Sequence, residues 1–141
     1  MALDSERYRG LADIRNALRR FVAASEVINR AAGITQQQYQ AMLAIKTRLS
    51  EAMPVRELAD QLLLTHNATV QLVNRLAKAG LAARSPSPED RRSVLLKLTP
   101  AGEALLDDLA TKHVVEMLRQ EPFLSRSLRR LKRLGPSTPE S

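Results

Sequence analysis

Apolar residues recur along most of the chain at the three- and four-residue intervals that an amphipathic helix requires. The first such segment follows Asp4 and Ser5, two residues that favour a helix start, and Gly33 ends it. The a and d positions of a narrow heptad seam are Leu11, Ile14, Leu18, Phe21, Ser25 and Ile28. A seam this long exceeds what a small domain needs for its own core, so we expect it to pack partly against a second chain. An antiparallel neighbour within the same chain is the alternative.

Capping signals divide the next stretch into two short helices. Thr35, followed three residues later by Gln38, forms a capping box for a helix over about 36–49. Pro54 opens a third helix that ends near Leu64 and carries apolar residues on one face.

The stretch THNATVQLVNRLAK, residues 65–78, predicts a fourth helix with two contrasting faces. Thr65 is its expected cap, with His66 and Asn67 as alternatives, and Gly80 ends it at a left-handed position. One face is apolar and the other carries amides and cations without any carboxylate: Asn67, Gln71, Asn74, Arg75 and Lys78. Such a face suits a DNA groove, although an ordinary solvated helix would also carry polar groups. Two short helices joined by a tight turn form a helix-turn-helix, whose second helix reads DNA.

The segments after Gly80 predict a hairpin and two more helices. Strand-like runs at 81–85 and 93–98 flank the charged, proline-containing tip PSPEDRR, and a hairpin in this position is a wing. Thr99 caps a fifth helix that runs to about Arg119, where we expect Pro122 to break it.

A last helix is expected over about 123–134, and residues 135–141 are expected to form a frayed tail. One face of this helix is apolar, through Leu124, Leu128, Leu131 and Leu134. Five basic residues surround that face: Arg126, Arg129, Arg130, Lys132 and Arg133. They indicate either a solvated face that pairs with acidic residues such as Asp13 or Glu26, or an additional contact with DNA or an acidic protein.

Composition narrows the class of protein. The chain has 141 residues, 44% of them apolar but only 3% aromatic, which favours packed helices over a β-sandwich. It has no Cys, which excludes disulfides and thiol chemistry, and its net charge of +7 favours a polyanionic partner. We expect a cytoplasmic protein, because the sequence shows no secretory signal and no apolar run long enough to span a membrane. With two His and no Gly-rich phosphate loop, the sequence offers no catalytic, metal or cofactor motif, so we expect no enzyme activity.

Three stretches carry a family resemblance: MPVRELADQL, THNATVQLVNRLAKAGL and RSPSPEDRRSVLLKLTPAGEALL. The most specific part is Asp90-x-Arg92 followed by a strand, then Leu98, Thr99 and Gly102. Together they resemble the MarR family of bacterial winged-helix transcription regulators. The resemblance implies a homodimer whose terminal helices interlock, so that two winged-helix lobes straddle a pseudo-palindromic operator. It also implies a small-molecule effector in many members, whose identity and site this sequence leaves unknown.

The resemblance and the residue types together assign roles. The reader helix is expected in the major groove, with Asn67, Gln71 and Asn74 reading bases or positioning phosphates. Arg75 and Lys78 are expected to hold phosphates. The resemblance places Arg92 in the minor groove, braced by an ion pair with Asp90, and Arg91 then falls on the DNA backbone.

Two residues near the reader face keep alternative roles. Val70 either meets a thymine methyl or packs under the wing. His66 either donates to a phosphate or helps cap the helix, next to Thr65.

These observations predict a mainly α fold with a small β-hairpin wing, in one domain over residues 1–141. Residues 1–34 and 100–134 are the expected dimerisation helices, with Leu11, Ile14, Leu18, Phe21, Leu124, Leu128 and Leu131 at the interface. Residues 35–99 are the expected DNA-binding lobe. The predicted function is a homodimeric, sequence-specific repressor. The alternatives are an architectural DNA binder and a protein-interaction module that keeps the fold.

Overall fold

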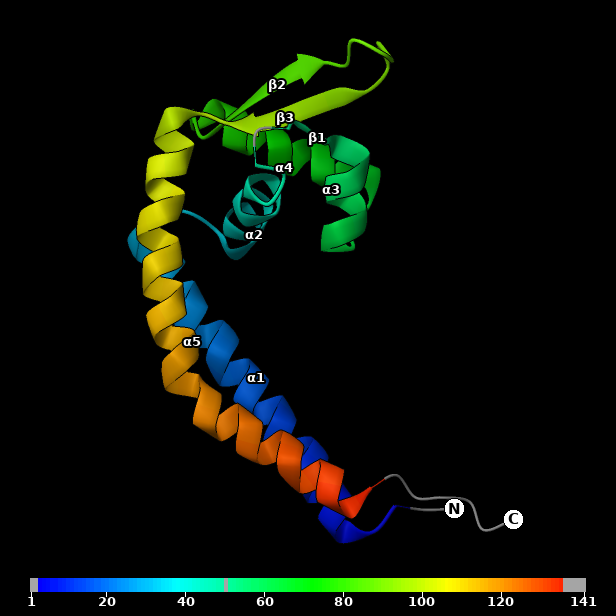
Figure 1. The fold of residues 1–141 in the computed structure, drawn as a ribbon, viewed down its shortest axis with the longest axis vertical. Coiled ribbons are helices and arrows are strands. Elements are labelled where there is room, and N and C mark those ends of the chain that lie inside the picture. Colours follow the sequence, from blue (N-terminus) through cyan, green and yellow to red (C-terminus); the bar gives the residue numbers. More distant parts are fainter. Residues whose placement is uncertain (1–2, 50, 136–141) are drawn as a thin grey trace, which may run out of the picture. The chain divides into compact units, whose positions relative to one another are not determined.

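The computed structural model describes residues 3–49 and 51–135, which form two compact units. Among the described residues, one unit combines 3–28 with 112–135, and the other comprises 29–49 and 51–111. The elements in chain order are α1 (Ser5–Ala31), α2 (Gln36–Lys46), β1 (Met53–Pro54), α3 (Val55–Leu62), α4 (His66–Lys78), β2 (Ala82–Pro86), β3 (Val94–Leu98) and α5 (Pro100–Leu134) (Figure 1). The predicted class, mainly helical with a small winged sheet, is confirmed. No helix in the described ranges is long and apolar enough to cross a membrane.

The unit of residues 29–111 is built on three short helices and a small sheet. Its strands are antiparallel in the order β1-β3-β2, with Met53 opposite Leu96 and Arg84 also opposite Leu96 on the other side. The largest side chains that are fully buried in this unit come from every layer: Met42, Met53, Leu58, Leu76, Leu96, Leu106 and Leu109. Because these side chains come from α2, β1, α3, α4, β3 and α5, a single apolar core fixes the sheet against the helices.

The helix starts follow the capping chemistry of the sequence. Thr35 forms the predicted capping box, in which its Oγ1 accepts from the backbone N–H of Gln38 at 3.1 Å. Thr65 caps α4 by accepting from Ala68 N–H at 3.1 Å, so the alternatives His66 and Asn67 do not take that position. Each of these contacts satisfies a backbone donor that the first turn of a helix leaves unpaired.

The chain between α2 and α3 differs from the prediction. The expected helix over 36–49 ends at Lys46, and Leu49 lies in the left-handed region at φ 57°. A left-handed residue cannot continue a right-handed helix. Two residues of β1, Met53 and Pro54, then pair with β3, and no strand was predicted for so short a segment.

In the unit of residues 1–28 and 112–135, α1 packs along α5. Gly10 provides close contact, since a Cβ there would lie 2.3 Å from a methyl carbon of Leu131. Arg130 donates to Glu6 at 2.9 Å and to Asp13 at 3.2 Å. These contacts confirm that part of the basic helix pairs with acidic residues, here within one chain.

The ion pair between Arg130 and Glu6 shifts the pKa values of both groups. The hydrogen bond from Arg130, with its positive charge, lowers the pKa of Glu6 below its ordinary value of 4.5. The same pair raises the pKa of Arg130. Both groups are therefore ionised at neutral pH.

The prediction that Pro122 ends the fifth helix and separates it from a last helix over 123–134 is wrong, because α5 continues through Pro122 to Leu134. Proline removes one backbone hydrogen bond from a helix interior. Contacts with α1 on both sides of the proline hold the helix: His113 Nε2 lies 2.8 Å from Ser25 Oγ, and the Arg20 guanidinium lies 5.6 Å from the centre of the Phe123 ring. These tertiary contacts outweigh the local cost of the proline.

Candidate nucleic-acid interface

Helix α4 presents the polar face that the sequence predicts. Its apolar side is buried through Thr69, Leu72, Val73 and Leu76. The opposite side is exposed and consists of Asn67, Gln71, Asn74, Arg75 and Lys78. The amides and cations are thus available to a partner and take no part in the core.

The tip of the wing is ordered by hydrogen bonds centred on Asp90. The Asp90 carboxylate accepts from the backbone N–H of Arg92 at 3.0 Å and from the Ser93 hydroxyl at 3.2 Å. The Ser93 N–H donates to the Asp90 carbonyl at 2.9 Å, which closes the turn. Asp90 therefore shapes the backbone that carries Arg92, and the described structure contains no ion pair between this carboxylate and the Arg92 guanidinium. The ion pair that the resemblance implies stays a prediction for the DNA-bound state.

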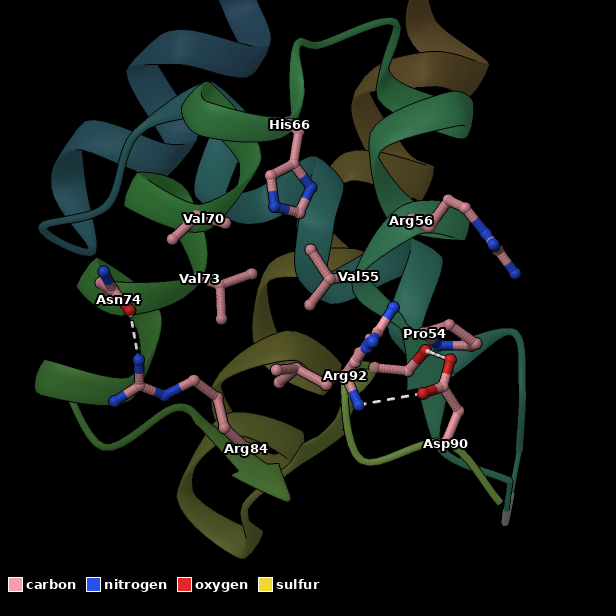
Figure 2. Close-up of a pocket in the computed structure, with 12 residues that line it drawn as sticks. Pro54, Val55, Arg56, His66, Val70, Val73, Asn74, Arg84, Asp90 and Arg92 are labelled. Carbon is pink, nitrogen blue, oxygen red and sulfur yellow. Dashed lines mark hydrogen bonds between the residues drawn. The ribbon is translucent and has the colours of Figure 1, made fainter. Parts of the chain in front are cut away.

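A cleft of about 390 Å³ lies between α4, the start of α3 and the wing. Figure 2 shows Val55, Val70 and Val73 on its inner side, with the side chains of Arg84 and Arg92 reaching toward it from the hairpin. Val70 is half-buried and lines this cleft. His66 lies on another part of the rim and is exposed.

Arg84 is a site residue that sequence reasoning missed. It lies on β2 and donates a hydrogen bond from its guanidinium to the side-chain oxygen of Asn74 on α4 (Figure 2). Side chains two apart on a strand share a face, and Ala82 on the same face is buried. The two-residue spacing of Ala82 and Arg84 in a predicted strand was the signal that both side chains lie on one face.

The exposed cations of this unit give the surface a positive field. Within residues 51–111, Arg75, Lys78, Arg91 and Arg92 are all exposed, and the structure shows no ion pair for any of them. Unpaired cations gathered on a helix and an adjacent wing attract a polyanion.

The predicted interface residues of the terminal helices are incompletely covered within the chain. Leu11, Leu18 and Leu128 are 47%, 42% and 51% exposed. The other four are half-buried: Ile14, Phe21, Leu124 and Leu131. In this unit the buried positions of α1 are Gly10, Ala17 and Ser25, and only Ser25 belongs to the heptad seam. The apolar residues of the seam are therefore largely left uncovered by contacts inside the chain.

Comparison with known proteins identifies the family. The family model described as MarR family matches residues 32–93. The chain is 32% identical over 107 residues to the uncharacterized HTH-type transcriptional regulator YsmB of Bacillus subtilis, covering 72% of this chain and 71% of that protein. The chain belongs to the MarR family of transcription regulators.

Solved MarR structures share the fold. A MarR transcription factor from Planctomyces limnophilus is 30% identical, with a TM-score of 0.70 over 96% of this chain and 98% of that one. A MarR variant from E. coli in complex with operator DNA is 25% identical, with a TM-score of 0.68 over 87% of this chain and 91% of that one. Two further curated regulators from Bacillus subtilis are matched over only 50% and 56% of their own length.

Proposed function

We propose that the chain is a homodimeric repressor that binds a pseudo-palindromic operator through α4 and the wing. The observation that carries this proposal is the exposed face of α4, which holds amides and cations and no carboxylate. A duplex presents base edges within grooves lined by phosphates, and such a face complements both. The E. coli MarR variant was solved in complex with operator DNA, which supports operator binding by a chain of this family.

On α4, Asn67, Gln71 and Asn74 contact base edges or position phosphates. Arg75 and Lys78 lie nearer the end of the helix and hold phosphates, which fixes the register on the duplex. The start of the helix adds His66 and the N-cap Thr65, beside backbone N–H groups that favour an anion. Val70, half-buried at the edge of this face, offers an apolar contact to a thymine methyl.

The wing places Arg92 in the minor groove and Arg91 on the backbone. A narrow, A·T-rich minor groove has an enhanced negative potential that attracts a guanidinium. Asp90 supports this contact by holding the turn through the backbone of Arg92 and the hydroxyl of Ser93.

The terminal helices, residues 1–34 and 100–134, supply the dimer interface. Leu11, Leu18 and Leu128, each more than two-fifths exposed in the single chain, become buried against a second copy. A twofold-symmetric pair of lobes places two reader helices in major grooves about 10 bp apart. A protein that binds an operator works where the DNA is, which is the cytoplasm of a bacterial cell.

A small-molecule effector and a purely regulatory, non-catalytic role complete the proposal. CouR of Rhodococcus jostii, a protein of the same fold, has been solved with p-coumaroyl-CoA bound. For the present chain, the effector's identity and site are open.

Selection of bound sequences from random duplexes, followed by anisotropy titration at fixed salt, tests the proposal. We expect a discrete, twofold-symmetric site, and Arg92→Ala is expected to weaken binding by about 1–3 kcal/mol, the scale of one specific contact. An affinity unchanged by Arg92→Ala would refute the minor-groove assignment. Enrichment of no site, with a footprint spread over the DNA, would favour an architectural role.

A further inference from the structure

The hydrogen bond between Arg84 on β2 and Asn74 on α4 links the wing to the reader face. A guanidinium has only N–H donors, whereas an Asn amide has one oxygen acceptor and one NH₂ donor group. The atom of Asn74 that faces Arg84 is therefore its oxygen, and the NH₂ group points away from Arg84, as Figure 2 shows.

We infer that Arg84 is a specificity-determining residue that makes Asn74 a donor toward DNA, so that the pair selects guanine over adenine at one position. This inference rests on the proposed function, because it assumes that α4 lies in the major groove. It adds a residue outside α4 and a base preference to that function.

The chemistry of the base edges gives the preference. An Asn amide reads adenine by donating to N7 while its oxygen accepts from the N6 amino group. Here one lone pair of that oxygen is already taken by Arg84. The remaining lone pair lies beside a cation with further N–H donors, and an incoming amino group, itself a donor, is disfavoured there.

Guanine offers the opposite pattern. Its major-groove edge has two acceptors, O6 and N7, and no donor at those positions. The Asn74 NH₂ group and the free N–H groups of Arg84 are all donors, and the positive charge of Arg84 strengthens the donating power of the amide to which it is bonded. Both members of the pair therefore favour an acceptor-rich edge.

The local structure holds this arrangement in place. Val73, beside Asn74 in sequence, is 2% exposed, which fixes this turn of α4 in the core. Arg84 lies opposite the fully buried Leu96 in the β2–β3 register, so the base of its side chain is fixed as well. The side chains of Arg84 and Asn74 are then the parts that have to be ordered when the bond forms.

Arg84→Met is the central variant, because it keeps most of the apolar stem and removes every donor. Arg56→Met is the matched control, since Arg56 lines the same cleft, is exposed, and forms no hydrogen bond with Asn74 in the described structure. Asn74→Ala identifies the base pair that Asn74 reads. Asn74→Asp keeps an acceptor for Arg84 but has no donor to offer DNA.

Sequences are selected from random duplexes with the wild type and each variant, after circular dichroism has verified folding. We expect a guanine in the wild-type site whose preference disappears in Asn74→Ala and shifts toward adenine in Arg84→Met. Arg56→Met is expected to lower affinity without changing any preference. Asn74→Asp is expected to lower affinity for the wild-type site about threefold to tenfold, the scale of one hydrogen bond.

The outcomes separate this inference from the proposed function. If the wild type selects a site and the base preference that disappears in Asn74→Ala is for adenine, the inference is wrong while the proposed function stands. The same holds if Arg84→Met selects the wild-type site unchanged, as Arg56→Met is expected to do. If the wild type enriches no sequence, the proposed function fails and this inference fails with it. If Arg84→Met does not fold, the identity of the base lost in Asn74→Ala and the loss in Asn74→Asp decide the matter.

Discussion

Gly102→Ala is a sensitive test of how the wing is attached to α5. Gly102 is buried in the first turn of α5, and a Cβ at this position would lie 2.0 Å from the carbonyl oxygen of Leu81. The Leu81 carbonyl accepts from the Thr99 N–H at 3.1 Å, and Thr99 Oγ1 donates to the Gly80 carbonyl at 2.5 Å. The obstructing atom therefore belongs to a backbone that is tied in place, so it cannot retreat as a flexible side chain would.

The expected magnitude follows from two opposing effects. Ala in place of Gly in a helix interior stabilises by about 1 kcal/mol through propensity. Overpacking a filled site typically costs about 1–3 kcal/mol, and a contact against fixed backbone belongs at or above the upper end. We expect a net loss of about 2 kcal/mol or more in the free energy of unfolding, which corresponds to roughly 4 °C in melting temperature per kcal/mol.

Urea denaturation followed by circular dichroism measures this loss. Gly10→Ala is the matched control, because a Cβ at Gly10 meets only the movable side chain of Leu131. It is expected to destabilise less than Gly102→Ala. A midpoint for Gly102→Ala at or above that of the wild type would refute the close approach of Gly102 to Leu81.

Three further predictions concern pH and salt. Because Arg130 lowers the pKa of Glu6, the pair stabilises the packing of α1 on α5 at a pH above 4.5, and this stabilisation is lost as the pH falls through the lowered pKa. Thermal unfolding of Arg130→Met should therefore depend less on acid pH than that of the wild type. An identical pH dependence would contradict the pairing. Burial raises the pKa of Tyr39 above its ordinary 10.0, so the folded state should lose stability as the pH rises beyond 10.0. Tyr39→Phe has no group to ionise there, so its unfolding curves should show less loss of stability at alkaline pH than those of the wild type. The affinity for DNA should fall steeply with salt. The slope of the logarithm of the binding constant against the logarithm of the salt concentration should become shallower by about one unit in Lys78→Met, and an unchanged slope would show that Lys78 contacts no phosphate.

Local chemistry made much of the unit of residues 29–111 predictable. The caps Thr35 and Thr65 and the division of α4 into buried and exposed faces depend on neighbours within one or two helical turns, which sequence spacing records. The hairpin followed from its charged, proline-containing tip between two apolar runs. The positions of the exposed residues were therefore predictable, while their contacts with DNA stay a prediction.

The features that sequence reasoning missed depend on distant parts of the chain. Pro122 was expected to end a helix on local grounds, but contacts of α5 with α1 override that cost. The two-residue strand β1 exists only because β3 lies beside it. Arg84 gains its role from a partner on another element, Asn74, and no spacing within β2 indicates that bond.

Site-directed cross-linking can test whether α4 lies in the major groove, because the chain has no cysteine and any introduced thiol is unique. Gln71→Cys, carrying a photoactivatable group, would be irradiated on the selected duplex and the cross-linked bases mapped. Gln40→Cys, at an exposed position of α2, serves as the control. We expect two clusters of cross-links in the major groove, about 10 bp apart, from Gln71→Cys and none from Gln40→Cys. Equal yields from both positions, or no cross-links from Gln71→Cys on a duplex that the protein binds, would contradict it.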